Sequence, residues 1–476
     1  MTSRRQLALT LLVAGTFFME NLDGTILATA APTIGRSFGV ESAAVGIAIT
    51  AYLLTLAVLI PISGWLTERF GARRIFAAAI ALFTVASVLC ATSTGLVELT
   101  VMRVLQGAGG AMMVPVGRLT VLRVTEKKDL VRAIAWLTWP ALAAPVLAPL
   151  LGGLIVTYAS WQWIFLLNVP LGAVAFIAAI RLVPPEAELA RHPLDWLGFA
   201  LTFAGLGFVV VFGSLLAGAD SPLALTIGSG ALGAVLVMLA IRHLLRTPHP
   251  LLDLSAFRIE TFRVTHAGGS LFRLAISAVP FLLPLFFQDA LGWSPLQAGA
   301  VVLMLFVGNL VIKPTTTPML TRWGFRVVLI VSTAGAAASM ALTAAVTALT
   351  PIVLIVILML FSGVVRSIGF TAYNTIAFAD VPGSEMTGAN TLASTVQQVA
   401  AGLGVAVGAV ALRFGAPIAA ALDRSEPSGA YQVAFWLIAL VAVVPLVEAA
   451  RLSKSAGENI RPQRRRISAA KGRGRR

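Results

Sequence analysis

Long apolar runs, separated by short polar or charged segments, follow one another along nearly the whole chain. A helix needs about 20 mostly apolar residues to cross the roughly 30 Å hydrocarbon core of a bilayer. Runs that end at charged residues, Gly, Pro or Asn therefore predict membrane-spanning helices. We expect fourteen of them, at 7–31, 43–66, 74–93, 97–117, 132–157, 162–183, 196–217, 222–242, 262–287, 295–319, 325–348, 351–374, 392–413 and 431–450.

The composition agrees with an all-α integral membrane protein. Of the 476 residues, 58% are hydrophobic and only 12% are charged, against about 25% charged residues in soluble domains. The first run is long for a cleavable signal, and no A-x-A-like site followed by a polar mature domain appears, so we expect it to remain as a membrane helix. Little of the chain is left for a soluble domain.

The positive charges predict the orientation. With Arg4 and Arg5 in the cytoplasm, most of the 35 Lys and Arg residues fall in cytoplasmic segments, and only Arg36, Arg413 and Arg424 fall in exterior ones. This asymmetry follows the positive-inside rule. We therefore expect a multi-pass protein of the cell (plasma) membrane, with cytoplasmic N- and C-termini.

Two features of the sequence argue against other functions. The basic tail from Arg461 contains no aromatic residues that could stack on bases, so we expect it to meet solvent or anionic headgroups and to bind no nucleic acid. Cys90 is the only cysteine, which excludes an intramolecular disulfide and a cysteine-based metal cluster. We expect no metal ion and no cofactor.

A weak internal repeat predicts two halves. "LTERFGAR" at 66–73 follows the second span, and "LTRWGFR" at 320–326 follows the tenth. The repeat predicts two six-helix bundles with two inserted helices between them, the arrangement of secondary transporters. The predicted divisions are an N-terminal bundle at 1–185, linkers with two extra helices at 186–250, a C-terminal bundle at 251–452 and a basic cytoplasmic tail at 453–476.

Five segments in order resemble the major facilitator superfamily, specifically its fourteen-span drug:proton antiporter branch. They are "GWLTERFGARRIF" from Gly64, "RVLQGAGGAMMVP" from Arg103, "WPALAAPVLAPLLGGLI" from Trp139, "WQWIFLLNVPLG" from Trp161 and "LDWLGFAL" from Leu194. The resemblance covers almost the whole chain to about residue 450. It departs from the family pattern where Glu68 replaces the usual Asp and Ala148 replaces a Gly.

The resemblance implies a cytoplasmic gate in the loop after the second span. Its residues are Gly64, Glu68, Arg69, Gly71, Arg73 and Arg74. A glycine permits a tight turn, and Glu68 can pair with the arginines and latch one closed state. Plain positive-inside anchoring would explain the arginines but leaves the acid unexplained.

The same resemblance implies an antiporter motif in the fifth span, with Pro145, Pro149, Gly152 and Gly153. Prolines kink a helix and glycines let a neighbouring helix approach closely. These residues predict either a bendable seam between the bundles or an irregular packed helix, and the sequence does not separate the two.

The first span contains two acids, Glu20 near its middle and Asp23 one turn further toward the outside. A charge at that depth costs about 2.5–3.5 kcal/mol or more, so the acids should face a partner or a wet cavity. Burial and a second acid nearby both disfavour the charged form of a carboxylate. We therefore expect these acids either to couple transport to protons or to form a structural ion pair with Arg103 of the fourth span, whose charge is permanent.

The second half carries buried cations and amides instead. Lys313 and Arg366 are expected to face a substrate cavity, and the further candidates are Asn309, Tyr373, Asn374, Arg273 and Gln397. Buried cations without acids on the same half indicate pairing across to Glu20 and Asp23 or contact with an anionic substrate. Arg273 and Gln397 could instead serve only helix packing.

These features predict a transporter and no enzyme. There is no G-x-x-x-x-G-K-[ST] loop to bind ATP and no arrangement of catalytic residues. We expect a proton-coupled secondary active transporter in the lipid bilayer that exports small lipophilic or cationic compounds by alternating access and functions as a monomer. The alternatives are a carrier of organic anions or amphipathic metabolites, and a receptor or scaffold that transports nothing.

Overall fold

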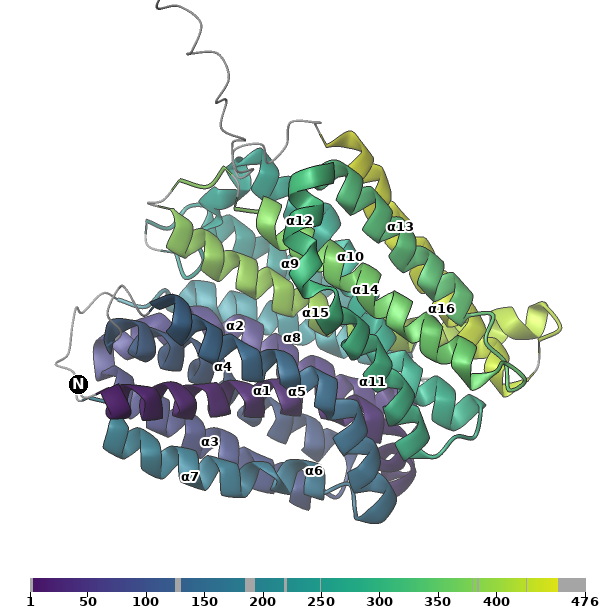
Figure 1. The fold of residues 1–476 in the computed structure, drawn as a ribbon, viewed down its shortest axis with the longest axis horizontal. Helices are drawn as coiled ribbons and strands as arrows, with labels where there is room; N and C mark the ends of the chain where they lie inside the picture. The colour runs from purple at the N-terminus through teal and green to yellow at the C-terminus, as the bar shows by residue number, and fades with distance from the viewer. Residues whose placement is uncertain are drawn as a thin grey trace, which may run out of the picture.

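The computed structural model describes residues 3–124, 130–184, 193–217, 221–248, 250–378, 380–382, 385–424 and 426–452. These residues form helices joined by short connections (Figure 1). Thirteen helical segments are long and apolar enough to cross a membrane. The predicted span at 132–157 lies in a helix of which Ala143–Tyr158 is the shorter apolar part. Fourteen spans therefore remain a prediction.

The first bundle is the purple and blue half of Figure 1. Its helices are α1 (Ser3–Phe38), α2 (Gly46–Phe70), α3 (Ala72–Thr92), α4 (Leu96–Val124), α5 (Leu130–Tyr158), the short α6 (Trp163–Leu166) and α7 (Asn168–Leu182). A 3-10 turn, η1 (Ser42–Val45), precedes α2. The predicted span at 162–183 is thus divided between α6 and α7.

The second bundle is the green and yellow half. It contains η3 (Leu254–Arg258), α10 (Glu260–Leu285), the π-helical turn η4 (Phe286–Ala290), α11 (Pro295–Val311), α12 (Lys313–Trp323), α13 (Phe325–Thr343), α14 (Ile352–Ile376), α15 (Met386–Ala421) and α16 (Pro427–Arg451). The predicted span at 295–319 is divided between α11 and α12, with Pro314 in the first turn of α12, where a missing backbone donor is tolerated.

The same pairings of helices recur in both bundles. In the first, α1 packs on α5, α2 on α4 and α3 on α7; in the second, α10 packs on α15, α11 on α14 and α13 on α16. Gly71 and Gly324 join equivalent helices in the two halves with nearly the same backbone, φ 84° and 79°. Because L-residues with a side chain rarely adopt that conformation, the two turns explain why both copies of the repeat carry a glycine.

The two bundles are joined at one end and separated at the other. They meet along two seams, α2 with α15 and α5 with α11. One apolar core includes Leu22 and Ile34 of α1 together with residues of α10 and α11, whereas Leu9 and Met19 of the same helix belong to a separate core within the first bundle. The bundles therefore share a core only beyond the middle of α1, at the end predicted to face outside.

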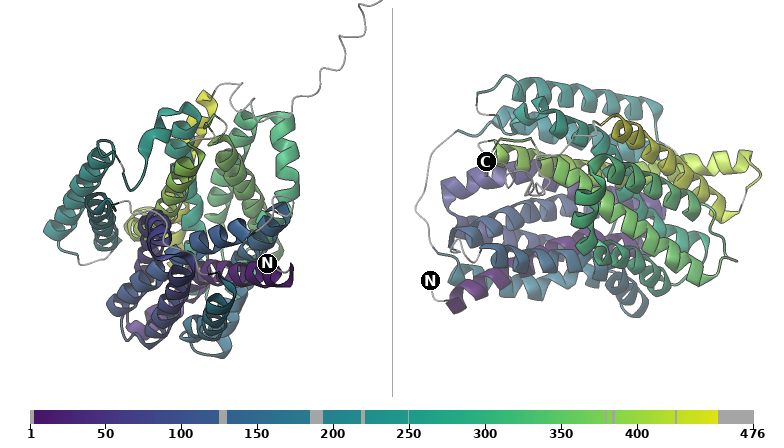
Figure 2. Two further views of the ribbon diagram at one scale, coloured as in Figure 1. Left: turned by 90° about the vertical axis from the view of Figure 1, so that its left-hand side faces the viewer. Right: turned by 45° about the horizontal axis from the view of Figure 1, so that its top comes forward.

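The inserted helices α8 (Trp196–Ala217) and α9 (Leu223–Leu244) form a hairpin beside the body, the teal pair at the left of the left-hand view in Figure 2. Helix α8 contacts α2 and α15, so the hairpin lies along one of the two seams. The side chain of Asp195 fixes the hairpin at its base, where it accepts hydrogen bonds from the backbone N–H of Gly198 (2.9 Å), from His243 Nε2 (2.7 Å) and from the backbone N–H of Leu251 (3.1 Å).

We predict that Asp195→Ala destabilises the protein. Burial alone would raise the pKa of Asp195, but the hydrogen bonds from Gly198, His243 and Leu251 outweigh it and hold the pKa below its usual range. A lost helix cap costs about 0.5–2 kcal/mol, so the unfolding midpoint of the purified protein should fall at neutral pH. Since the folded pKa is depressed, this stabilisation is present above the ordinary Asp pKa of about 3.9 and is lost as the pH falls through the folded value.

The matched control is Glu41→Ala, which removes an exposed acid. Thermal unfolding in detergent, followed at neutral and acidic pH, provides the measurement. An equal midpoint for Asp195→Ala and the wild type at neutral pH would contradict the assigned role of Asp195.

Candidate functional site

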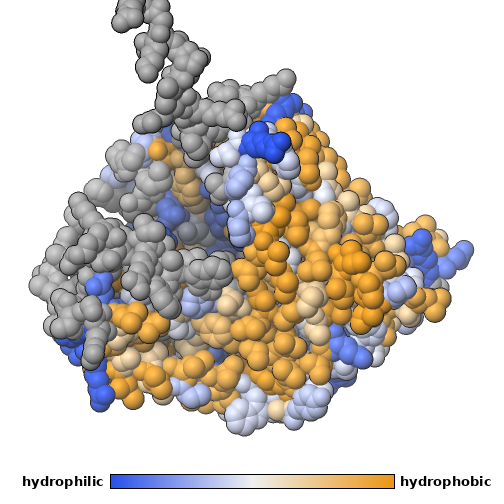
Figure 3. Space-filling model, in the orientation of Figure 1, coloured by the Kyte–Doolittle hydropathy of each residue, from blue (hydrophilic) through white to orange (hydrophobic). Residues whose placement is uncertain are grey.

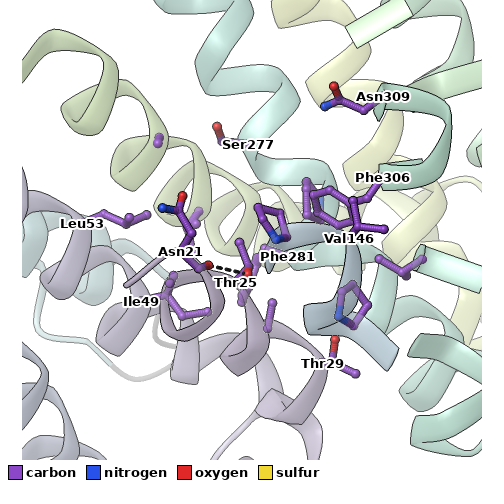
Figure 4. A pocket seen from close by; sticks show the side chains of 18 of the residues that line it. Asn21, Thr25, Thr29, Ile49, Leu53, Val146, Ser277, Phe281, Phe306 and Asn309 are labelled. Carbon is purple, nitrogen blue, oxygen red and sulfur yellow. Dashed lines mark hydrogen bonds between the residues drawn. The ribbon is translucent and has the colours of Figure 1, made fainter. Parts of the chain in front are cut away.

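A cavity of about 350 Å³ lies between the two bundles. Figure 4 shows it from close by, with Asn21 and Thr25 of α1 on one side and Phe306 and Asn309 of α11 on the other. Helices α2, α5, α10, α12, α14 and α15 also contribute to the wall. Since the wall is built from both bundles, any motion of one bundle against the other would change its shape.

A second cavity, of about 900 Å³, lies where α2 and α4 end and α15 begins. Its wall includes Gly64, Arg118 and Gln397. The space-filling view shows a hollow between the bundles with hydrophilic residues inside it (Figure 3). In the predicted orientation this end faces the cytoplasm. The bundles would then be closed together on the exterior side and separated by a cavity on the cytoplasmic side.

Glu20 lies on the wall of both cavities. Its side chain is only 9% exposed, and Oε2 has no hydrogen-bond partner among the residues that the structure describes. A Cβ added at Gly110 would lie 3.6 Å from Cγ of Glu20 and 3.2 Å from the hydroxyl oxygen of Tyr52, so the glycine provides the space for both side chains. The carboxylate of Glu20 is thus buried, uncompensated and next to both cavities.

Asp23 has the opposite environment, although it is only one turn away. Its carboxylate forms an ion pair with Arg103 and accepts hydrogen bonds from Gln106 Nε2 and Asn168 Nδ2, both at 2.9 Å. Gln106 also donates to Ser87 (2.8 Å), and Asp23 is 2% exposed and lines neither cavity.

Arg103 is held on its other side by aromatic rings. Its guanidinium carbon lies 4.0 Å from the ring centre of Tyr52 and 5.9 Å from that of Phe165. An ion pair with added hydrogen bonds and a cation–π contact offsets the cost of burying both charges, although Nε and Nη2 of Arg103 have no hydrogen-bond partner among the described residues. The structure therefore contains the ion pair that the sequence offered as one of two roles for these residues.

The candidate substrate residues of the second half divide into two groups. Lys313, Arg366 and Asn309 line the central cavity, and Gln397 lines the second one. The remaining three, Arg273, Tyr373 and Asn374, line neither cavity.

The three residues outside the cavities pack against neighbouring side chains. Arg273 Nη2 and Gln397 Nε2 both donate to Asn374 Oδ1, at 2.5 and 3.2 Å. Tyr373 packs against Phe272, with 5.3 Å between ring centres. The packing role that the sequence left open for Arg273 and Gln397 is thus present in the structure.

Sequence reasoning missed several residues. The second half does contain a half-buried acid, Glu448 of α16, whose Oε2 is buried next to Gly268 and has no partner among the described residues. Asn21 lines the central cavity and Arg118 lines the second. Glu448 stands inside a predicted span, and an acid in an apolar span was enough to mark it as a candidate. For an uncharged polar residue such as Asn21, the sequence does not indicate whether it faces the cavity.

The predicted gate is described in part. Gly64 lies on the second cavity, and the guanidinium of Arg69 lies 5.3 Å from the ring centre of Trp65. Among the residues that the structure describes, neither Arg73 nor Arg74 forms an ion pair with an acid. The side chain of Glu68 is outside the described residues, so the predicted latch remains a prediction.

The predicted antiporter motif lies at the joined end. Pro145 and Pro149 line the central cavity. A Cβ at Gly152 would lie 3.1 Å from the backbone oxygen of Ile26 in α1, and one at Gly153 would lie 2.6 Å from the backbone oxygen of Pro295 in α11. The two glycines therefore allow α5 to pack closely on its neighbours in both bundles.

The sequence matches the profile of the Major Facilitator Superfamily over residues 13–260 and 265–472. The chain belongs to the Major Facilitator Superfamily. Among curated relatives, a putative multidrug resistance protein MdtD from Escherichia fergusonii is 35% identical over 460 residues, covering 96% of this chain and 97% of the relative. The MdtD protein of Escherichia coli O157:H7 has the same identity and coverage.

Solved structures of this superfamily fold are also similar. A D-xylose–proton symporter superposes with a TM-score of 0.67 at 14% identity, covering 95% of this chain and 99% of that one. The nucleoside transporter NupG superposes with a TM-score of 0.59 at 14% identity, covering 94% and 98%. At such identities the likeness concerns the fold alone. The predicted fold, two six-helix bundles with two inserted helices, is confirmed.

We predict that losing one partner of the Asp23–Arg103 pair destabilises the protein more than losing both partners. Removing one partner of a buried ion pair costs about 3–5 kcal/mol, because the other charge remains buried, whereas neutralising both costs much less. Asp23→Asn and Arg103→Gln should therefore each lower the unfolding midpoint in detergent. The double variant should unfold closer to the wild type than either single variant does. Single variants with wild-type midpoints would contradict the pairing.

Proposed function

We propose that the chain is a secondary active transporter that exports small lipophilic or cationic compounds in exchange for protons. The name of the curated relatives, multidrug resistance protein, supports this class of cargo. A mostly apolar cavity between two bundles that meet at only one end supports alternating access. We further propose that it works as a monomer in the plasma membrane with both termini in the cytoplasm.

One observation supports the proton coupling most strongly: the carboxylate of Glu20 lies on both cavities and has an oxygen without a partner. An uncompensated charge in a membrane interior costs about 2.5–3.5 kcal/mol or more, so Glu20 has a reason to take up a proton when water leaves the cavity. Asp23 is compensated by Arg103 and has no such reason. We therefore assign proton exchange to Glu20 and give Asp23 and Arg103 a positioning role on the same helix.

The exchange follows from the two states of the Glu20 carboxyl group. Ionised, it attracts the cationic group of a compound that enters from the hollow end. Protonated, it no longer holds that group, and the compound can leave. A proton and a cationic cargo thus compete for one carboxylate, and competition of this kind couples their movements in opposite directions.

The proposed motion would open the joined end and close the hollow one. At the joined end, Thr50 Oγ1 of α2 donates to the backbone oxygen of Gly402 in α15 (3.1 Å), and Gln288 Nε2 donates to the backbone oxygen of Thr29 (2.9 Å). These few polar contacts between the bundles would break on opening. The turn at Gly71, with its arginines, is the proposed gate at the other end.

We predict that Glu20→Gln abolishes proton coupling. In proteoliposomes with an imposed pH gradient, the wild type should move ethidium against its concentration gradient and release protons on the opposite side. Glu20→Gln should lose both activities and retain the wild-type unfolding midpoint, because glutamine has the shape of the protonated acid. Glu98→Gln, which removes an exposed acid at the start of α4, is the matched control.

The result for Asp23→Asn separates the two acids. The part of that variant that folds should still couple ethidium movement to protons. Normal coupling in Glu20→Gln, or loss of coupling in folded Asp23→Asn alone, would overturn the assignment.

A further inference from the structure

The guanidinium of Arg366 lies on the wall of the central cavity and forms no ion pair within the described part of the chain. Arg366 belongs to α14 and is 8% exposed, and its Nε and Nη1 have no hydrogen-bond partner among the residues that the structure describes. An arginine keeps its charge in any protein environment. A buried charge without a partner is costly, so a ligand that supplies an anion would find it unsatisfied.

Lys313 provides a second cation on the same wall. It begins α12, and its Nζ donates one hydrogen bond, to Thr371 Oγ1 of α14 at 3.1 Å. An ammonium group has three donors, so donors remain for a ligand. Like Arg366, Lys313 forms no ion pair with an acid in the described part of the chain.

Close packing of α11 and α14 positions Arg366, and the hydrogen bond to Thr371 of α14 positions Lys313. A Cβ at Gly308 of α11 would lie 2.2 Å from the backbone oxygen of Leu360, and one at Gly363 of α14 would lie 1.8 Å from the backbone oxygen of Leu305. The backbones of α11 and α14 therefore touch, as their adjacent positions in Figure 1 suggest. One turn further along, both helices have reached the cavity, where Asn309 stands beside the two cations on its wall.

The rest of the cavity suits an apolar molecule. Phe281, Phe306 and Pro280 line it, and Figure 4 shows Phe281 and Phe306 within the group of side chains around the space. Glu20, on the first bundle, is the one acid among its lining residues. Among the described residues, the wall therefore carries an arginine and a lysine against a single acid, Glu20.

From this arrangement we infer that Arg366 and Lys313 form an anion subsite, which binds the carboxylate of an amphiphilic substrate whose apolar body lies along Phe281 and Phe306. The inference rests on the proposed function, because it describes the cargo of the same cavity. A cationic group at the other end of such a molecule would face Glu20. Compounds that carry both charges would thus be bound better than compounds that carry a positive charge alone.

The test uses two dyes that differ only at one carboxylate. Rhodamine 110 has a free carboxylate, and rhodamine 123 is its methyl ester. Binding is measured by fluorescence anisotropy with the full chain in nanodiscs of phosphatidylcholine and without a pH gradient. The wild type should bind rhodamine 110 more tightly. Arg366→Gln and Lys313→Gln should each weaken rhodamine 110 by about tenfold, as expected for a lost charge-assisted hydrogen bond, and change rhodamine 123 by less than about twofold.

Two further variants serve as controls. Arg322→Gln removes an exposed charge from the same helix as Lys313 and should change neither dye. Arg366→Lys keeps the charge and should retain part of the preference, which keeps the test decisive if Arg366→Gln fails to fold.

Three results would overturn the inference. The first is equal binding of both dyes by the wild type. The second is an equal loss of affinity for both dyes in the Gln variants, as expected if the cations only neutralise Glu20 in another state. The third is competition between phosphatidylglycerol and rhodamine 110, which would assign the subsite to a lipid headgroup. Because no proton gradient is used, a failure of proton coupling leaves this binding preference measurable, and the two proposals fail separately.

Discussion

The cost of holding a charge away from water governs the interior of this protein. Asp23 and Arg103 meet that cost together, since the carboxylate has Gln106 and Asn168 as further donors and the guanidinium lies over Tyr52. Glu20 lies on the same helix, and its Oε2 has no hydrogen-bond partner among the described residues that would offset this cost. Two acids of equal chemistry thus have different surroundings, and on this basis we propose that Asp23 is part of the scaffold and that the charge state of Glu20 changes.

The second constraint is the close approach of helices at glycines. The α5–α11 contact at Gly153 and the α11–α14 contact at Gly363 leave no room for a side chain. Contacts of this kind fix which faces of the helices reach the cavity, so they position Pro149 on one side and Arg366 on the other. The proposed motion would keep the helix pairs inside each bundle and change the pairs between bundles, chiefly α2 with α15 and α5 with α11, together with α1 against α10 and α11.

Much of the fold followed from the sequence because hydrocarbon imposes a simple rule on apolar runs. The repeat at 66–73 and 320–326 also gave the two halves, and its glycines proved to share one backbone conformation. The breaks within spans were not foreseen. The interruption before Lys313 and the π-helical turn at Phe286–Ala290 depend on local packing, for which an apolar run gives no signal.

The sequence predicted that charged residues inside the spans form the site, but only partly which of these residues face the cavity. Depth in a span identified Glu20, Asp23, Lys313 and Arg366 as charges that need an explanation, yet spacing alone could not tell which acid faces the cavity and which faces Arg103. The two acids are three residues apart and so lie near the same face of α1, where their separate fates depend on α4 and α7. The roles of Arg273 and Asn374 depend in the same way on a neighbouring helix that one-dimensional reasoning does not place.

The central claim is that Glu20 exchanges a proton while Asp23 remains paired with Arg103. Infrared difference spectroscopy of the purified protein, recorded between alkaline and acidic buffer, tests it directly through the C=O stretch of a protonated carboxyl group. The account predicts that this band is present in the wild type, vanishes in Glu20→Gln and remains in Asp23→Asn. A band that persists in Glu20→Gln and vanishes in Asp23→Asn would contradict it.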